Sequence, residues 1–294
     1  MKIKDSMPRK AFNLFNILFM LFMIVICLYP FLYILFASFS DPAELLKVDG
    51  LLLKPAGFSL AGYKAVLNNK EIYVGYGNTI FYVAVGTTLN VLVTALLAYA
   101  LSRKNLKYGK HMMLFIVITM FFNGGMIPAY LLVKNLHLLD TRWAVILPGL
   151  VVTYNLIVMR TSFASIPESL EESAKLDGAN DVLILFKIVL PLSKSTLAVM
   201  VLFYGVSHWN AWFNAMLYLP TRRDLYPLQL LLREILINSS TDSMMMDTTV
   251  GKGASLEEVI KYATVMVATL PILAIYPFLQ KYFVKGVMVG AVKG

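Results

Sequence analysis

The side chains that could bind or react gather in one polar stretch of an otherwise apolar chain, ESLEESAKLDGANDVLILFKIVLPLSK at residues 168–194. Five acids and three lysines lie in it, together with Gly178. An acid four residues before a lysine, followed by a glycine, is typical of a solvated helix that ends in a turn. The stretch therefore predicts a short polar helix, a glycine turn and a second, apolar helix.

The first helix has a predicted start and a predicted surface ion pair. Ser165 and Glu168 match the S-x-x-E capping box, and Pro167 falls in the first turn, where its missing N–H does no harm. The acids lie towards the positive end of the helix dipole, and Glu171 is placed to pair with Lys175. We therefore expect Ser165 to cap this helix.

Three further residue types predict the turn and the second helix. Gly178 suits the left-handed backbone that commonly ends a helix. Asn180 or Asp181 can cap the second helix, VLILFKIVL, and Pro191 interrupts it. A purely structural loop would carry the same features, so local chemistry alone leaves two interpretations open, a structural loop and a docking element.

Catalytic and metal-binding patterns are absent from the sequence. His111, His137 and His208 lie in separate segments without metal-ligand spacing, and no H-E-x-x-H pattern occurs. The GKGAS segment at 251–255 lacks the spacing of a phosphate-binding Walker loop, and the single Cys27 excludes an internal disulfide. We therefore predict a non-enzymatic chain without metal or cofactor. His208 is left with two roles, packing or substrate contact.

The elements that carry the polar stretch are predicted from composition. Of 294 residues, 59% are hydrophobic and only 15% charged, whereas a soluble domain carries about 25% charged residues. Because a charge at mid-membrane costs about 2.5 kcal/mol or more, long uncharged runs indicate membrane spans. The six uncharged runs are Ala11–Phe39, Gly77–Ser102, Met112–Val133, Trp143–Met159, Ser195–Thr221 and Tyr262–Gln280.

The charges between these runs predict the sidedness of the chain. Fifteen Lys and Arg face six acids in the segments on the side of the termini, 1–10, 103–111, 160–194 and 281–294. Eleven of each sign occur in the opposite segments, 40–76, 134–142 and 222–261. The positive-inside rule therefore places both termini and the polar stretch in the cytoplasm, and it accounts for the basic composition without nucleic acid. The first run is too long for a signal peptide, so we expect an uncleaved span.

The residues from Glu172 to Ala179, ESAKLDGA, followed by Ile188 and LPL, resemble the EAA loop of permease subunits of ATP-binding-cassette importers. Ser173 and Ser195 depart from the usual pattern, both at positions that tolerate small residues. The stretches at 78–103, 208–217 and 280–294 resemble the carbohydrate-uptake branch. Within it, they are similar to the second permease subunit, related to the maltose permease MalG and to the LplC/YtcP group.

This resemblance implies an all-α membrane fold of six transmembrane helices, the MetI-like type I importer permease. The implied organisation is a cytosolic N-terminus at 1–10, a permease domain at 11–284 with the coupling loop at 161–194, and a cytosolic tail at 285–294. In the family the loop forms a coupling helix that seats in an ATPase cleft, and the tail, here Gly286–Gly294, can reach the same interface. The implied coupling residues are Glu168, Glu171, Glu172, Ala174, Asp177, Gly178, Ala179 and Pro191.

The resemblance also implies the assembly. The partners are a second, homologous permease, two cytosolic ATPases that bind ATP and Mg²⁺, and an extracellular solute-binding lipoprotein docked around 40–76 and 222–261. The chain would be a multi-pass protein of a bacterial plasma membrane, in contact with lipid, that imports a sugar, specifically an oligosaccharide. Two alternatives stay open, a permease for polyamines, amino acids or phosphate, and a non-transport docking protein.

Aromatic and amide side chains are the groups expected to line a sugar pathway. The same residue types also form interfacial aromatic belts and hydrogen bonds between membrane helices, and the partner permease can supply all sugar contacts. The candidates are Asn123, Tyr130, Tyr154, Asn155, Trp209, Asn210, Trp212 and Asn214.

Overall fold

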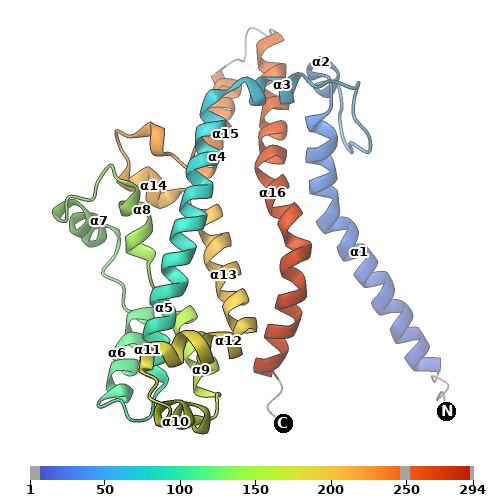
Figure 1. The fold of residues 1–294 in the computed structure, drawn as a ribbon. Coiled ribbons are helices and arrows are strands. Elements are labelled where there is room, and N and C mark those ends of the chain that lie inside the picture. Colours follow the sequence, from blue (N-terminus) through green and yellow to red (C-terminus); the bar gives the residue numbers. More distant parts are fainter. Residues whose placement is uncertain (1–6, 246–251, 292–294) are drawn as a thin grey trace. The chain divides into compact units, whose positions relative to one another are not determined.

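The computed structural model describes residues 7–245 and 252–291, and these residues are overwhelmingly helical. Their only extended pairing is an isolated bridge between Ser40 and Phe58. The chain divides into two compact units, Met1–Asn69 with Leu232–Leu270 (unit 1) and Lys70–Leu231 with Pro271–Gly294 (unit 2). The all-α prediction is therefore confirmed (Figure 1).

Unit 1 contains the long apolar helix α1 (Met7–Ser38), whose most apolar stretch has no buried residue within the chain. Two short helices follow, α2 (Pro42–Leu45) and α3 (Ala61–Asn68). Helix α3 approaches α16 (Lys252–Ala291) so closely that a Cβ on Gly62 would lie 2.8 Å from Val259 Cγ1. The glycine therefore permits this helix contact.

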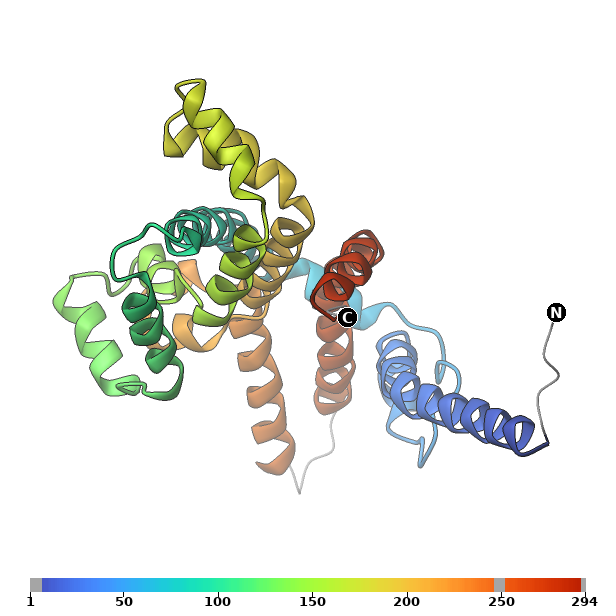
Figure 2. The same ribbon diagram turned by 90° about the horizontal axis from the view of Figure 1, so that it is seen from below.

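Unit 2 is built on one continuous helix over Lys70–Ser102, formed by α4 (Lys70–Phe81), a π-helical turn η1 (Tyr82–Gly86) and α5 (Thr87–Ser102). At 33 residues it is about 50 Å long, enough to cross a membrane core of about 30 Å. Helix α5 packs against α9 (Thr153–Ala164) and α13 (Lys194–Trp209) (Figure 2). Their shared core includes Ala98, Met159, Phe163, Met200 and Tyr204.

Two of the predicted spans, Met112–Val133 and Trp143–Met159, are broken helices, and a third bent pair leads into the predicted span Ser195–Thr221. The first break separates α6 (Gly109–Phe121) from α7 (Met126–Asn135) by a bend of 114°, at Gly125 with φ +88°. The second break, of 54°, lies between Arg142–Gly149 and α9. The third, of 88°, follows Asp181–Leu192 and precedes α13. Within residues 7–245 and 252–291, three helices are long and apolar enough to span, namely Met7–Ser38, Lys70–Ser102 and Leu256–Ile275, and counting each bent pair as one span gives up to six.

Several predicted boundaries are wrong for the same reason. The run Ser195–Thr221 is not one helix, because α13 ends at Trp209 and α14 (Phe213–Tyr218) is separate. The segment 222–261, which lies between two of the uncharged runs, contains α15 (Leu228–Met245) and the start of α16. Uncharged composition reports where the chain is apolar, but it does not report where a helix bends or continues into charged sequence.

The second break leaves backbone groups that neighbouring side chains satisfy. Asn90 Nδ2 donates to the carbonyls of Gly149 and Leu150, both at 2.8 Å, and the Val152 N–H donates to the Tyr204 hydroxyl at 3.2 Å. His208 Nε2 lies 2.7 Å from Asn90 Oδ1. A broken membrane helix requires such partners because no water replaces the missing backbone bonds. The contact of His208 with Asn90 supports the packing role for this histidine.

At the other end of the long helix, α4 holds the loop before α15. Asn78 Nδ2 donates to the carbonyls of Asp224 and Tyr226 at 2.8 and 3.1 Å. The Tyr82 hydroxyl donates to the Leu225 carbonyl at 2.9 Å. These bonds, with a 2.9 Å bond from the Leu228 N–H to Thr79 Oγ1, fix residues 222–228, which we call the α4-end loop.

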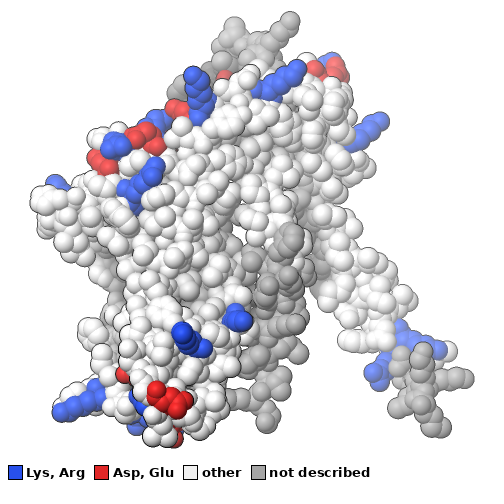
Figure 3. All heavy atoms as spheres, viewed as in Figure 1, with Lys and Arg blue, Asp and Glu red and all other residues white. Residues whose placement is uncertain are grey.

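The charged side chains of unit 2 are unevenly distributed along the direction of the long helix. In Figure 3 they gather towards the two ends of this unit, and the zone between is largely uncharged. Such a distribution is typical of a bundle whose middle lies in a membrane.

Candidate functional site

The polar stretch 168–194 forms the helices that its sequence predicts. Helix α10 (Glu168–Leu176) is followed by Gly178 at φ +83° and by α11 (Asp181–Ile184). Asn180 caps α11, since its side chain accepts from the Leu183 N–H at 2.8 Å. The glycine turn and the second cap are therefore confirmed. Figure 1 shows α10 and α11 as two short helices.

The segment that leads from α11 back to α13 is interrupted near Pro191, as predicted. A π-helical turn η3 (Leu185–Val189) continues α11 and leads to α12 (Leu190–Leu192), which contains Pro191. The chain then bends before α13. Because proline restricts the backbone before it and donates no N–H, Pro191 fits the end of this segment better than the interior of a straight helix.

Two local predictions for α10 are wrong. Pro167 is the N-cap, with extended backbone at ψ 131°, and no side chain caps the helix. Ser165 Oγ instead donates to the Ser162 carbonyl at 2.7 Å, which belongs to the preceding helix. Lys175 pairs across the turn with Asp181 at 3.1 Å rather than with Glu171. Both side chains thus bond other near neighbours in the sequence than the predicted ones.

Glu171 turns into the protein and pairs with Arg103, the residue that follows α5. Their side chains are 7% and 16% exposed. Arg103 also donates to the Phe163 carbonyl at 3.1 Å and to Ser102 Oγ at 3.0 Å, and its guanidinium lies 4.8 Å from the centre of the Tyr99 ring. Glu171 therefore connects α10 to the end of the long helix.

Beside this buried pair lies an exposed one. Lys104 Nζ is 3.1 Å from Glu168 Oε1, and both side chains are largely in solvent. A hollow of about 210 Å³ separates the 103–105 segment from α10. Its lining includes Glu168, Glu171 and Glu172.

A second hollow, of about 300 Å³, lies at the turn between α10 and η3. Ala174, Asp177, Gly178 and Ala179 line it, together with side chains of α11 and η3. The structure therefore brings four of the eight predicted coupling residues around one concave surface and three around the other. Pro191 lines neither hollow.

The predicted pathway residues of α13 and its continuation lie close in sequence and differ in environment. Trp209 is buried, and its Nε1 has no hydrogen-bond partner among the described atoms. Asn210 is the exposed C-cap of α13. The Trp212 ring meets Phe213 edge-on, and Asn214 lies in α14.

The remaining pathway candidates occupy other elements. Asn123 accepts from the Gly125 N–H at 2.8 Å in the break between α6 and α7. The Tyr130 ring stacks on the Tyr218 ring of α14, with 6.4 Å between the ring centroids. On α9, Tyr154 is exposed beside the Phe203 ring, and Asn155 is buried. Asn123 thus stabilises a turn, and Tyr130 takes part in a contact between α7 and α14.

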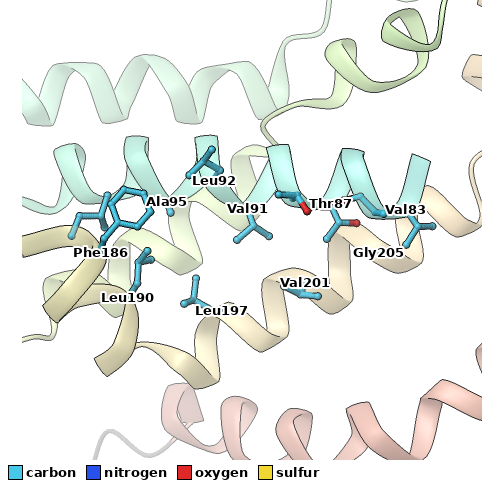
Figure 4. A pocket seen from close by; sticks show the side chains of 13 residues that line it. Val83, Thr87, Val91, Leu92, Ala95, Phe186, Leu190, Leu197, Val201 and Gly205 are labelled. Atoms are coloured by element: carbon cyan, nitrogen blue, oxygen red, sulfur yellow. Dashed lines mark hydrogen bonds between the residues drawn. The ribbon is translucent and has the colours of Figure 1, made fainter. Parts of the chain in front are cut away.

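A larger groove of about 580 Å³ runs between the long helix and the segment from η3 to α13 (Figure 4). Apolar side chains such as Val91, Phe186 and Leu197 line it. The Thr88 hydroxyl donates to the Ala84 carbonyl at 2.7 Å, which leaves Thr87 as the main free polar group. A sugar needs several hydrogen-bonding partners, so this groove is unsuited to one.

With this geometry in place, comparison with known proteins defines the class. Residues 81–289 match the family profile of the binding-protein-dependent transport system inner membrane component. The chain therefore belongs to this family of transporter permease components, which are membrane subunits rather than enzymes, as the sequence predicted.

Particular relatives sharpen the class. The chain is 42% identical over 288 residues to the polygalacturonan/rhamnogalacturonan transport system permease protein YtcP of Bacillus subtilis, covering 98% of this chain and 100% of YtcP. Protein LplC of the same organism is 42% identical over 286 residues, covering 97% and 96%. A chain in the crystal structure of a bacterial ABC transporter that imports the acidic polysaccharide alginate matches with a TM-score of 0.86 and 31% identity, covering 96% of this chain and all of that one. The resemblance stated from the sequence is confirmed.

Sequence reasoning missed Arg103 as a site residue. It counted this arginine only as one positive charge among fifteen on the predicted cytoplasmic side. The available signal was the position of Arg103 directly after the long uncharged run, where an arginine can bond the last groups of a helix.

Proposed function

We propose that this chain is a permease subunit of an ATP-driven, binding-protein-dependent importer of oligosaccharides. The observation that carries the proposal is the identity with YtcP across the whole chain. The likeness to a chain of the alginate importer supports the same class of cargo. Because alginate and polygalacturonan are both polymers of acidic sugars, acidic oligosaccharides are the proposed substrates.

In this proposal the six spans cross the membrane with both termini in the cytoplasm. The positive bias of the segments on the α10 side supports that orientation. The other components are a second permease, two ATPases and an extracellular binding protein. The permease domain covers 11–284. Residues 1–6 and the side chains of the proposed tail contact at Gly286–Gly294 lie outside the described part of the structure, although α16 extends to Ala291.

Helix α10 would transmit the motion of the ATPases. The concave surface at its C-terminal end supports this role, because Leu176 beside it is 91% exposed. An apolar side chain left in solvent next to a hollow is typical of a protein contact surface. Closure of the ATPases would move α10 as a rigid body and shift the permease between inward-open and outward-open states.

The experiment that tests the transport function is uptake of labelled sugars by cells with and without the gene. The panel contains oligogalacturonides, alginate oligosaccharides, neutral oligosaccharides and monosaccharides. We expect loss of an acidic oligosaccharide only. If all sugars enter normally while a polyamine, amino acid or phosphate does not, the cargo assignment is wrong. If no solute is affected, a non-transport docking role replaces the proposal.

Gly178 offers a sharp test of the coupling role. A Cβ at this position would meet no atom of the chain within 4 Å, yet the positive φ strains any ordinary side chain. Gly178→Ala and Gly178→Glu therefore share the backbone strain, and only the glutamate reaches further out. We expect Gly178→Glu to keep assembly and lose uptake per ATP hydrolysed, with Gly178→Ala affected much less. Equal effects of the two variants would contradict a partner surface at this turn.

A further inference from the structure

We propose that Arg103 is a positioning residue that joins α10 to the end of the Lys70–Ser102 helix, so that movement of α10 is passed to this helix. The inference rests on the proposed coupling function and names the contact within this chain that carries it. It is drawn from the burial and geometry of the Arg103–Glu171 pair.

The position of Arg103 makes it an extension of the long helix. It is the C-cap of α5, and its N–H donates to the Ala100 carbonyl at 3.4 Å. Its Cα is therefore fixed by the helix, and its guanidinium is held against the Tyr99 ring one turn earlier. A force on the guanidinium acts directly on the end of this helix.

The contact with α10 is the buried one. Glu171 is the only charged residue among the buried residues that the structure describes. Burial excludes water and strengthens the attraction between the carboxylate and the guanidinium. The pairs Lys104–Glu168 and Lys175–Asp181 are exposed, so solvent and salt weaken them.

Other attachments of α10 do not replace this one. Arg160 Nε donates to the Leu101 carbonyl at 2.8 Å, but Arg160 belongs to α9 and so ties α9 to the long helix. Helix α10 follows α9 through the uncapped turn at Pro167. The Arg103 guanidinium contacts both Glu171 of α10 and the Phe163 carbonyl of α9. It thus fixes α10 relative to both neighbours at one point.

The test uses the complete transporter in vesicles, with uptake per ATP hydrolysed as the readout. We expect Arg103→Gln and Glu171→Gln to assemble and hydrolyse ATP, and to transport roughly five-fold less or worse per ATP, the lower end of coupling between sites. The exchanged pair Arg103→Glu with Glu171→Arg should regain part of the loss. Lys104→Gln, which breaks the neighbouring exposed pair with Glu168, should leave the ratio unchanged.

A distance measurement separates transmission from simple stability. Spin labels at Leu176→Cys on α10 and Leu97→Cys on α5, in a Cys27→Ser background, report the spacing of the two helices. We expect this spacing to stay constant between the nucleotide-free and ATP-bound states, and to change between them once Arg103→Gln is added.

Three outcomes would overturn the inference. They are normal coupling in an assembled Arg103→Gln transporter, an unchanged label distance in that variant, and an equal loss of coupling in the Lys104→Gln control. Should Arg103→Gln fail to assemble, Glu171→Gln carries the test, because it leaves Arg103 bound to Phe163 and Ser102. Failure of the proposed function looks different, since the unmodified complex would then show no ATP-dependent sugar uptake.

Discussion

The two ends of the Lys70–Ser102 helix hold their neighbouring segments in different ways. In the α4-end loop, residues 222–228, the backbone is held by buried neutral side chains of Asn78, Thr79 and Tyr82, and an exposed ion pair joins Arg223 to Glu71 of α4. At the far end, α10 is held by the buried ion pair between Arg103 and Glu171, beside the exposed pair of Lys104 and Glu168. Asn78 and Arg103 are about 37 Å apart along the helix, so we expect the contacts at the two ends to be independent of each other.

One helix therefore holds its two neighbours by different means. At the α4 end, several neutral hydrogen bonds share the load, so the loss of one bond leaves the others in place. At the other end, the buried Arg103–Glu171 pair holds α10 at a single contact, through which α10 can pass a force to the long helix.

The largest effect is expected from Arg103→Ala. Removing the arginine leaves the buried Glu171 carboxylate unpaired, which costs about 3–5 kcal/mol of folding free energy. We expect a lower unfolding temperature in detergent and faster amide hydrogen exchange in α10, with the α4-end loop unchanged. The double variant Arg103→Met with Glu171→Leu should recover most of the loss, because neither charge is then left buried. Faster exchange at both ends would contradict the independence of the two regions.

Asn78→Ala should act at the opposite end and cost less. Asn78 is 3% exposed, and its loss leaves the Asp224 and Tyr226 carbonyls without this donor. The expected cost is about 1–3 kcal/mol. Hydrogen exchange should quicken in the loop and stay unchanged in α10. A uniform change along the chain would show that Asn78 acts through global stability instead.

A pair of glycines on α4 tests whether the loop's approach is as close as described. A Cβ on Gly75 would lie 2.7 Å from Leu231 Cδ1 and 3.2 Å from Leu228 Cα, whereas a Cβ on Gly77 would meet nothing within 4 Å. Gly75→Ala should therefore destabilise by about 1–3 kcal/mol. Gly77→Ala should be neutral or stabilising by up to about 1 kcal/mol. Thermal unfolding of both variants measures the contrast, and similar values would refute the close approach.

The smallest effect concerns acid. Arg222 donates two 2.8 Å hydrogen bonds to Asp224, and they lower the pKa of that carboxyl. The stabilisation is therefore present above the ordinary aspartate pKa of about 3.9 and is lost as pH falls through the lower folded value. At neutral pH, the Asp224→Asn variant should unfold at a slightly lower temperature than the unmodified protein. In acid, the two unfolding temperatures should be equal. Because both side chains are exposed, added salt should shrink the difference; a difference that grows in acid would contradict the pairing.

Local sequence determined much of this protein. The uncharged runs predicted a helical membrane protein, Gly178 predicted a left-handed turn, and Asn180 predicted a cap. These features depend on composition or on residues within one helical turn, so they can be read without the fold. The EAA-like spacing predicted the family for a similar reason, since its residues are consecutive.

The partners of the buried polar groups depend on the tertiary structure. The bends of 114° and 54° fall inside two of the uncharged runs, whereas the bend of 88° follows Pro191 at the end of the polar stretch. Arg103 and Glu171 are 68 residues apart, and Asn78 and Asp224 are 146 apart. Pairing over such separations depends on how helices pack, because a buried charge or carbonyl takes the partner that packing brings within reach, whatever the local pattern offers.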